Sequence, residues 1–255
     1  MIPAPDAALI AAAGALAGIV GTAGGITSLV SYPALLAIGV PALAANVANI
    51  VALAACWPGA ALTSRPELEG RASWLWRWAP VAIAGGAIGA VLLLCTPSSA
   101  FDRVVPFLIA IGSLALLVQP RLSALRQTAL RQGHARHNTA ILLAGLLAVS
   151  VYSGYFGAGS GVMALALLLF TVDQRMAHAN ALKNMIIGAA TVVSALALVI
   201  AVRVDWPAVI PLGIGLFAGS MIGPLLARRI PARLLRWLVA LLGLGLAVKL
   251  WIAPT

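Results

Sequence analysis

The sequence predicts an all-α polytopic membrane protein made of two similar halves. Three observations lead to this prediction: an apolar composition, apolar runs of membrane-spanning length, and an internal repeat. Of the 255 residues, 62% are hydrophobic and 9% are charged, and the mean hydropathy is +1.06. A soluble fold of this size would expose a mostly apolar surface to water. We therefore expect lipid to be the solvent for most of the chain.

The apolar runs set the number of segments. A helix needs about 20 apolar residues to cross the hydrocarbon core of a bilayer. Eight runs in the chain meet or approach this length, and tryptophans near several of their ends suit the membrane–water interface. The eight predicted segments are residues 9–38, 44–63, 79–95, 104–118, 139–170, 180–202, 206–227 and 234–251.

The first four segments resemble the last four. Three glycines recur 136 positions later, Gly18, Gly21 and Gly25 matching Gly154, Gly157 and Gly161. Other pairs follow at offsets of 131 to 136, such as Ala45-Asn46 with Ala179-Asn180. A duplication of this kind predicts two four-segment membrane repeats, residues 1–119 and 138–255, joined by a basic cytoplasmic linker at residues 120–137.

The first and fifth segments each contain a glycine-rich run, Gly18–Gly25 and Gly154–Gly161. Glycine tolerates backbone angles that end a helix, so we expect both segments to be broken helices. As continuous helices they would be roughly 45 Å long, against a hydrocarbon core of roughly 30 Å. Broken backbone inside a bilayer is tolerated only where protein buries it or where it lines a water-filled cavity. Two matching breaks therefore predict a site.

Each broken segment could be a tilted crossing or a re-entrant hairpin that enters and leaves on one side. Cytoplasmic loops collect Lys and Arg, so basic residues help to decide. If all eight segments cross, the fifteen basic residues other than Lys183 divide nine to six between the two sides. If segments 1 and 5 are re-entrant, they divide twelve to three. The charge distribution therefore favours re-entrant hairpins in two inverted repeats.

The charges exclude several classes of function. All six acidic residues lie at or outside segment ends, which argues against a proton relay, a carboxylate-lined cation path and an acid/base enzyme. The net charge of +10 lies in short stretches between segments, so topology explains it better than nucleic-acid binding. The GxxxxGK[ST] pattern is absent, and Cys56 and Cys95 show no metal spacing. We expect no cofactor, no metal and no enzyme activity.

Lys183 is the one basic residue near an intramembrane position. A buried lysine normally faces a cavity or a partner, although this one could instead extend to the headgroups. Asn180 lies three positions before it and Asn184 directly follows it, while Asn46 and Asn49 form the counterpart in the first half. Such amides could simply pair between helices. Their recurrence after both breaks favours a shared cavity.

Helices that begin at the breaks would point backbone N–H groups into this cavity, which suits an oxyanion. Ser28, Ser153 and Tyr155 could add hydroxyl donors, and His178 is by default a surface histidine, with proton coupling as the alternative. The predicted substrate-binding residues are Gly21, Gly24, Gly25, Asn46, Asn49, Gly157, Gly159, Ser160, Gly161, Asn180, Lys183 and Asn184.

Several of these stretches resemble the sulfite exporter TauE/SafE family of membrane permeases. They are the run from Gly21-Thr-Ala-Gly24-Gly25 to Tyr32-Pro33, its second copy, the Ala-Asn-Ala-Leu-Lys183-Asn184 stretch, and the closing ARRIPARLLRWLVALLGLGLAVKL. The resemblance implies a permease of the bacterial inner membrane for small sulfur-containing oxyanions such as sulfite, sulfonates or sulfoacetate. The first copy has no lysine, so one fixed cation would serve the site.

The membrane potential suggests a direction of transport. Moving one negative charge out of a cell that is negative inside gains about 2.3 kcal/mol per 100 mV, so export needs no coupling ion. We therefore expect export of a small anionic substrate across the bilayer, with no nucleic-acid partner. The alternatives are uptake coupled to a proton or to sodium bound by backbone carbonyls at the breaks, and a non-transporting scaffold. The sequence leaves the oligomeric state open.

Overall fold

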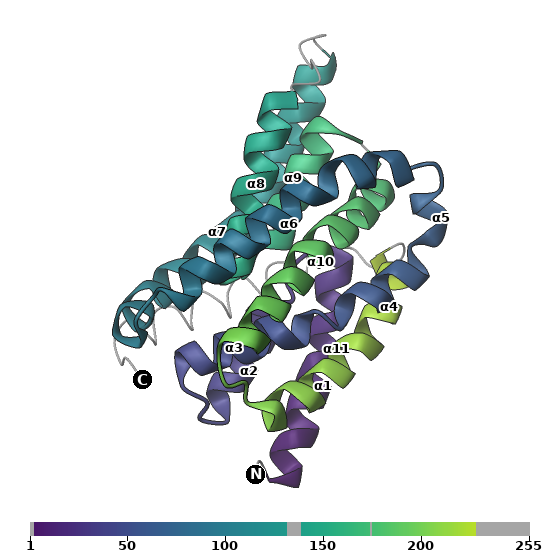
Figure 1. Ribbon diagram of the computed structural model, residues 1–255. Coiled ribbons are helices and arrows are strands. Elements are labelled where there is room, and N and C mark those ends of the chain that lie inside the picture. The colour runs from purple at the N-terminus through teal and green to yellow at the C-terminus, as the bar shows by residue number, and fades with distance from the viewer. Residues whose placement is uncertain (1–2, 132–138, 174, 228–255) are drawn as a thin grey trace.

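The computed structural model describes residues 3–131, 139–173 and 175–227 (Figure 1). Within these ranges every element is a helix, which confirms the all-α prediction. The helices are α1 (Ala4–Gly24), α2 (Ser28–Ala37), α3 (Ala42–Leu53), α4 (Cys56–Thr63), α5 (Arg65–Leu68), α6 (Ala72–Leu94), α7 (Ser98–Arg131), α8 (Thr139–Tyr155), α9 (Ser160–Thr171), α10 (Met176–Ala201) and α11 (Trp206–Ala227).

The helices have the lengths and surfaces of a multi-pass membrane protein. In the described residues, five helical stretches are long and apolar enough to cross a bilayer, and α2, α8 and α9 are shorter apolar helices. Large apolar side chains cover the outside, among them Ile200, Ile214 and Leu196 at 85%, 64% and 56% exposure. Such a surface is favourable in lipid and unfavourable in water.

The first seven predicted segments correspond to these helices, with two main differences. The second segment bends at Ala54 and Ala55, so α3 and α4 share it. The helix α7 continues to Arg131, well into the predicted linker, because residues 121–131 are rich in the helix formers Leu, Ala, Arg and Gln. The last segment, residues 234–251, lies outside the described residues. The organisation into two four-segment repeats therefore stays a prediction.

Both predicted breaks are present. The first separates α1 from α2, and the second separates α8 from α9. Gly25 ends α1 with a φ of 86°, and its N–H bonds to the Gly21 carbonyl. Gly157 and Gly159 have φ values of 79° and 77°. This left-handed backbone favours glycine because a side chain there is strained.

The two breaks touch each other. A Cβ atom on Gly25 would lie 2.4 Å from the carbonyl carbon of Gly161, and one on Gly161 would lie 2.6 Å from the Gly25 Cα atom. Two segments far apart in the sequence therefore meet backbone to backbone at residues where only hydrogen fits. Small residues permit similar close approach along α1 and α11, which lie side by side in Figure 1.

The chain reverses at the second break. Gly145 on α8 lies against Leu167 on α9, which places the start of α8 beside the end of α9. In Figure 1 both helices lie in the upper part of the molecule, whereas the α2–α3 and α10–α11 connections lie at the lower end with the N-terminus. Two hydrophobic clusters follow this division. One includes Val40 and Val204 from the lower connections, and the other includes Leu142 and Val172 from the start of α8 and the end of α9.

An ion-pair cluster joins two connections at the upper end. Asp173, between α9 and α10, accepts hydrogen bonds from the Arg71 side chain at 2.5 Å and from the Arg175 backbone N–H at 2.9 Å. His178 Nδ1 lies 3.2 Å from the same carboxylate. Burial raises the pKa of the Asp173 carboxyl, but the hydrogen bonds from Arg175 and His178 and the charge of Arg175 outweigh this effect. The pKa of Asp173 therefore lies below the usual range for aspartate.

The contact between the breaks predicts unequal effects for two adjacent glycines. Gly25→Ala places a methyl group at positive φ and against Gly161, so we expect it to lower the free energy of unfolding by about 2 kcal/mol or more. Gly24→Ala is the matched control, because a Cβ there meets nothing within 4 Å and alanine favours helix. Thermal unfolding followed by circular dichroism in detergent compares the two, and equal transition temperatures would contradict the fold described here.

Candidate functional site

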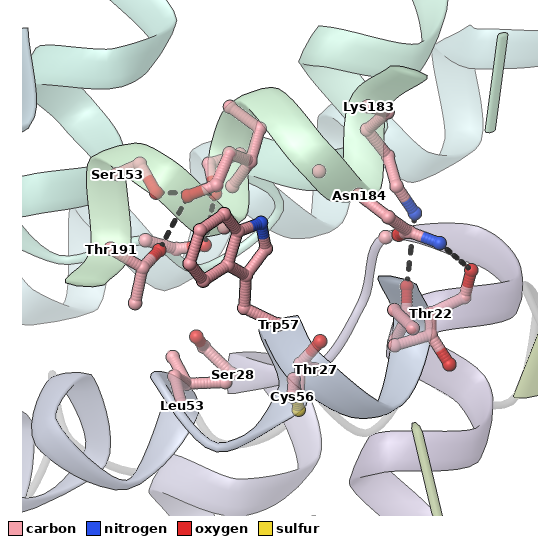
Figure 2. Close-up of a pocket in the computed structure, with 18 residues that line it drawn as sticks. Thr22, Thr27, Ser28, Leu53, Cys56, Trp57, Ser153, Lys183, Asn184 and Thr191 are labelled. Atoms are coloured by element: carbon pink, nitrogen blue, oxygen red, sulfur yellow. Dashed lines mark hydrogen bonds between the residues drawn. The ribbon is translucent and has the colours of Figure 1, made fainter. Parts of the chain in front are cut away.

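A cavity of about 70 Å³ lies at the junction of the two breaks (Figure 2). A buried water needs roughly 10–15 Å³ on this measure, so several waters or one small oxyanion would fit. One part of the wall is polar and comprises Thr22, Thr27, Ser28, Ser153, Ser160, Thr191, Lys183 and Asn184. Another part is apolar and comprises Leu53, Cys56, Trp57, Ala60 and Ile187. Glycines at positions 21, 25, 157, 161 and 188 complete it.

Lys183 brings a positive charge to this cavity. Its side chain is 2% exposed, so it stays inside the protein rather than extending to the headgroups. The Nζ atom donates a hydrogen bond to the Gly21 carbonyl at 3.1 Å. This carbonyl belongs to the last turn of α1, where the helix dipole is negative and attracts a cation. Among the described residues, Lys183 is the one charged side chain on the cavity wall, and no carboxylate lines it.

Two amides of α10 support the same helix end. Asn180 and Asn184 donate hydrogen bonds to the Thr22 carbonyl at 2.9 Å and 3.1 Å. Helix ends leave carbonyl groups without intrahelical partners, and lipid offers no replacement. With Lys183, these side chains bond to two carbonyls in the last turn of α1, those of Gly21 and Thr22. Asn184 also lines the cavity, whereas Asn180 is 5% exposed and does not.

The first half contains the reciprocal arrangement. Asn46 on α3 donates a hydrogen bond to the Tyr155 carbonyl, the last residue of α8, at 2.9 Å. Asn49 follows three residues later on the same face of α3, and its Oδ1 atom accepts a hydrogen bond from the Ser31 hydroxyl at 2.5 Å. Both amides are fully buried and neither lines the cavity. Each half therefore supplies a helix whose asparagine caps the broken helix of the other half.

The predicted residues thus divide into two groups. Seven of them line the cavity, namely Gly21, Gly25, Gly157, Ser160, Gly161, Lys183 and Asn184. The structure does not bring the other five there. Asn46, Asn49 and Asn180 act in helix contacts, Gly159 packs against Gly112, and a Cβ on Gly24 would meet no neighbour within 4 Å.

Of the side chains predicted to add hydroxyl donors, some line the cavity and others do not. Ser28 and Ser153 line the cavity as expected. Ser160 Oγ donates to the Gly157 carbonyl at 2.8 Å and lies 3.3 Å from Ser153 Oγ. Tyr155 points elsewhere, because its hydroxyl bonds to Thr96 at 3.3 Å. His178 lies with Asp173 and is not part of the cavity wall.

Sequence reasoning missed most of the apolar wall. Leu53, Trp57 and Ala60 follow Asn49 at intervals of three or four residues, so they extend the same helical face past the bend. Ile187 and Thr191 follow Lys183 in the same way on α10. Helical periodicity from the predicted polar residues could have found all five. Figure 2 shows Trp57 between Ser153 and Thr191 on one side and Lys183 and Asn184 on the other.

Comparisons with known proteins identify the kind of membrane protein. The family described as Sulfite exporter TauE/SafE matches the chain over residues 7–250. A probable membrane transporter protein, ORF9, from Sinorhizobium sp is 24% identical over 249 residues, which cover 94% of this chain and 90% of that relative. No solved structure matches significantly. The chain therefore belongs to the sulfite exporter TauE/SafE family and is a multi-pass membrane transporter rather than an enzyme.

Proposed function

We propose that this transporter moves small sulfur-containing oxyanions, such as sulfite or organosulfonates, out of the cell through the cavity at the two breaks. The observation that carries the proposal is the buried ammonium group of Lys183 on a wall rich in hydroxyl groups, with no carboxylate among the described lining residues. Burying an anion is costly unless a charge and hydrogen bonds compensate for the lost water. This wall supplies both.

The geometry suggests how an oxyanion would be held. An ammonium group has three N–H donors, and the Gly21 carbonyl accepts from one direction, which leaves donors for a second acceptor. Thr27, Ser28 and Ser153 lie on the same wall, and glycines let the anion approach the backbone closely. The apolar wall around Trp57 would face the organic group that is bonded to the sulfur atom of an organosulfonate.

The location of the cavity within the membrane follows from the topology that we propose. In this topology, α1–α2 and α8–α9 are re-entrant hairpins in two oppositely oriented repeats, residues 1–119 and 138–255, of a bacterial inner-membrane protein. The basic linker at residues 120–137 would lie in the cytoplasm. The touching tips, Gly25 and Gly161, would then meet near the membrane midplane.

Contacts between connections support this topology. If every segment crossed, the connection before α6 and the one before α10 would lie on opposite sides of the membrane. Instead, Arg71 and Asp173 from these two connections form an ion pair. The antiparallel contact of Gly145 with Leu167 also supports a hairpin in the second half. The 21-residue length of α1, roughly 31 Å, favours the competing tilted crossing for the first segment alone.

Export down the membrane potential agrees with the charges that line the cavity. A proton-coupled mechanism normally uses Asp, Glu or His side chains within the membrane, and the described wall has none. The described cavity wall offers Lys183 and neutral groups. An anion carried with no coupling ion would leave a cell that is negative inside.

The transport proposal predicts a voltage-dependent anion flux in proteoliposomes. Sulfite efflux should follow an imposed potential, and Lys183→Met should reduce it at least about tenfold, because the buried anion loses its countercharge. Arg203→Met removes an exposed basic side chain and should leave the flux unchanged. Normal flux through Lys183→Met would refute the site. Absence of any anion flux from the folded protein would favour a scaffold, and flux driven only by a sodium or proton gradient would favour coupled uptake.

The topology proposal predicts which single cysteines share a face. In a Cys56→Ser, Cys95→Ser background, Ala37→Cys before α3 and Asp205→Cys before α11 should react with a membrane-impermeant thiol reagent from the same side. Glu69→Cys before α6 should react only from the opposite side. All three replaced residues are exposed. Labelling of Ala37→Cys and Asp205→Cys from opposite sides would show that the fifth segment, residues 139–170, crosses.

A further inference from the structure

We infer that the cavity accepts singly charged oxyanions, preferably those that carry one O–H group such as hydrogensulfite, and rejects doubly charged ones such as sulfate. This inference rests on the proposed function and specifies the charge state of the transported anion. It follows from the fixed charges around the cavity, from the directions in which the wall hydroxyls donate, and from the cost of an uncompensated charge.

The described cavity wall carries one basic side chain, Lys183, and no acidic one, so at most one positive unit faces an occupant. Helix ends carry partial charges of roughly half a unit, positive at the N-terminus and negative at the C-terminus. Each break brings one end of each sign together, since α1 ends where α2 begins and α8 ends where α9 begins. The partial charges therefore offset each other in pairs. The countercharge for a bound anion is that of the lysine.

Part of the wall can only accept hydrogen bonds from the cavity. The hydroxyl groups of Thr22, Ser160 and Thr191 donate to the carbonyls of Gly18, Gly157 and Ile187 at 2.6, 2.8 and 2.8 Å. A hydroxyl has one proton, so these three oxygens offer only lone pairs to an occupant. A fully deprotonated dianion has no proton to donate to them. A singly charged oxyanion with one O–H group can donate to one of these oxygens while its other oxygens face Lys183.

A dianion would also leave one negative charge without a partner. The neighbouring groups are buried, with Lys183 at 2% exposure and Thr22 and Ser160 at 4% each. An unpaired charge in such surroundings is strongly unfavourable, and removing one member of a buried ion pair is costly for the same reason.

The test compares three anions in proteoliposomes of the intact chain at one imposed potential. Methanesulfonate is always singly charged, sulfate is doubly charged, and sulfite changes from singly to doubly charged near neutral pH. We expect methanesulfonate flux to exceed sulfate flux by about tenfold or more. The ratio of sulfite flux to methanesulfonate flux should fall as the pH rises, in proportion to the hydrogensulfite fraction. Equal fluxes of sulfate and methanesulfonate would overturn the inference and leave the transport proposal intact.

A variant with a second positive charge provides an independent readout. Ile187 lies on the cavity wall one helical turn from Lys183, so Ile187→Lys should raise sulfate flux relative to methanesulfonate. Ile187→Met is the matched control, because methionine is similar in length to lysine and carries no charge. An unchanged ratio in folded Ile187→Lys would count against the inference. If no anion exceeds its flux in protein-free liposomes, the inference and the proposed function both fail.

Discussion

The structure depends on hydrogen bonds between side chains of one half and the carbonyl groups at the broken helix ends of the other half. A helix that stops inside a bilayer leaves its last carbonyls without partners, and lipid offers none. At the end of α1, Asn180 and Asn184 bond to the Thr22 carbonyl and Lys183 bonds to the Gly21 carbonyl. At the end of α8, Asn46 bonds to the Tyr155 carbonyl. These bonds make two interrupted helices tolerable at the same place. The cavity exists because both interruptions are there.

The reciprocity of these bonds ties the cavity to the relation between the two halves. Lys183 and Asn184 both hold the end of α1 and line the cavity, so an anion bound there contacts the groups that join the halves. The direct contact of Gly25 with Gly161 gives the junction a second connection made of backbone alone. A change in the position of one half would therefore move side chains that line the substrate site that we propose.

The sequence was sufficient to predict those features of the fold and the site that depend on local chemistry. Glycine clusters in apolar runs predicted both breaks. For Lys183 the sequence left both a cavity and the headgroups open, and the structure places the side chain inside the protein. The sequence was insufficient where two helices must be placed together. An asparagine on an apolar helix has the same local pattern whether it only bonds to a neighbouring helix end, as Asn46 does, or also faces a cavity, as Asn184 does. Trp57 reaches the cavity wall because Gly188 on another helix leaves room for its ring.

The central claim is that the joined breaks form a wet, positively charged cavity among lipid-covered helices, and cysteine reactivity tests it most directly. In the cysteine-free background, Thr27→Cys lies on the cavity wall and Leu16→Cys lies on the outer face of α1, where leucine is 53% exposed. The account predicts that a small hydrophilic thiol reagent modifies Thr27→Cys and not Leu16→Cys, and that methanesulfonate slows the reaction. Equal lack of reaction at both positions, or a reaction at Thr27→Cys that methanesulfonate does not slow, would contradict it.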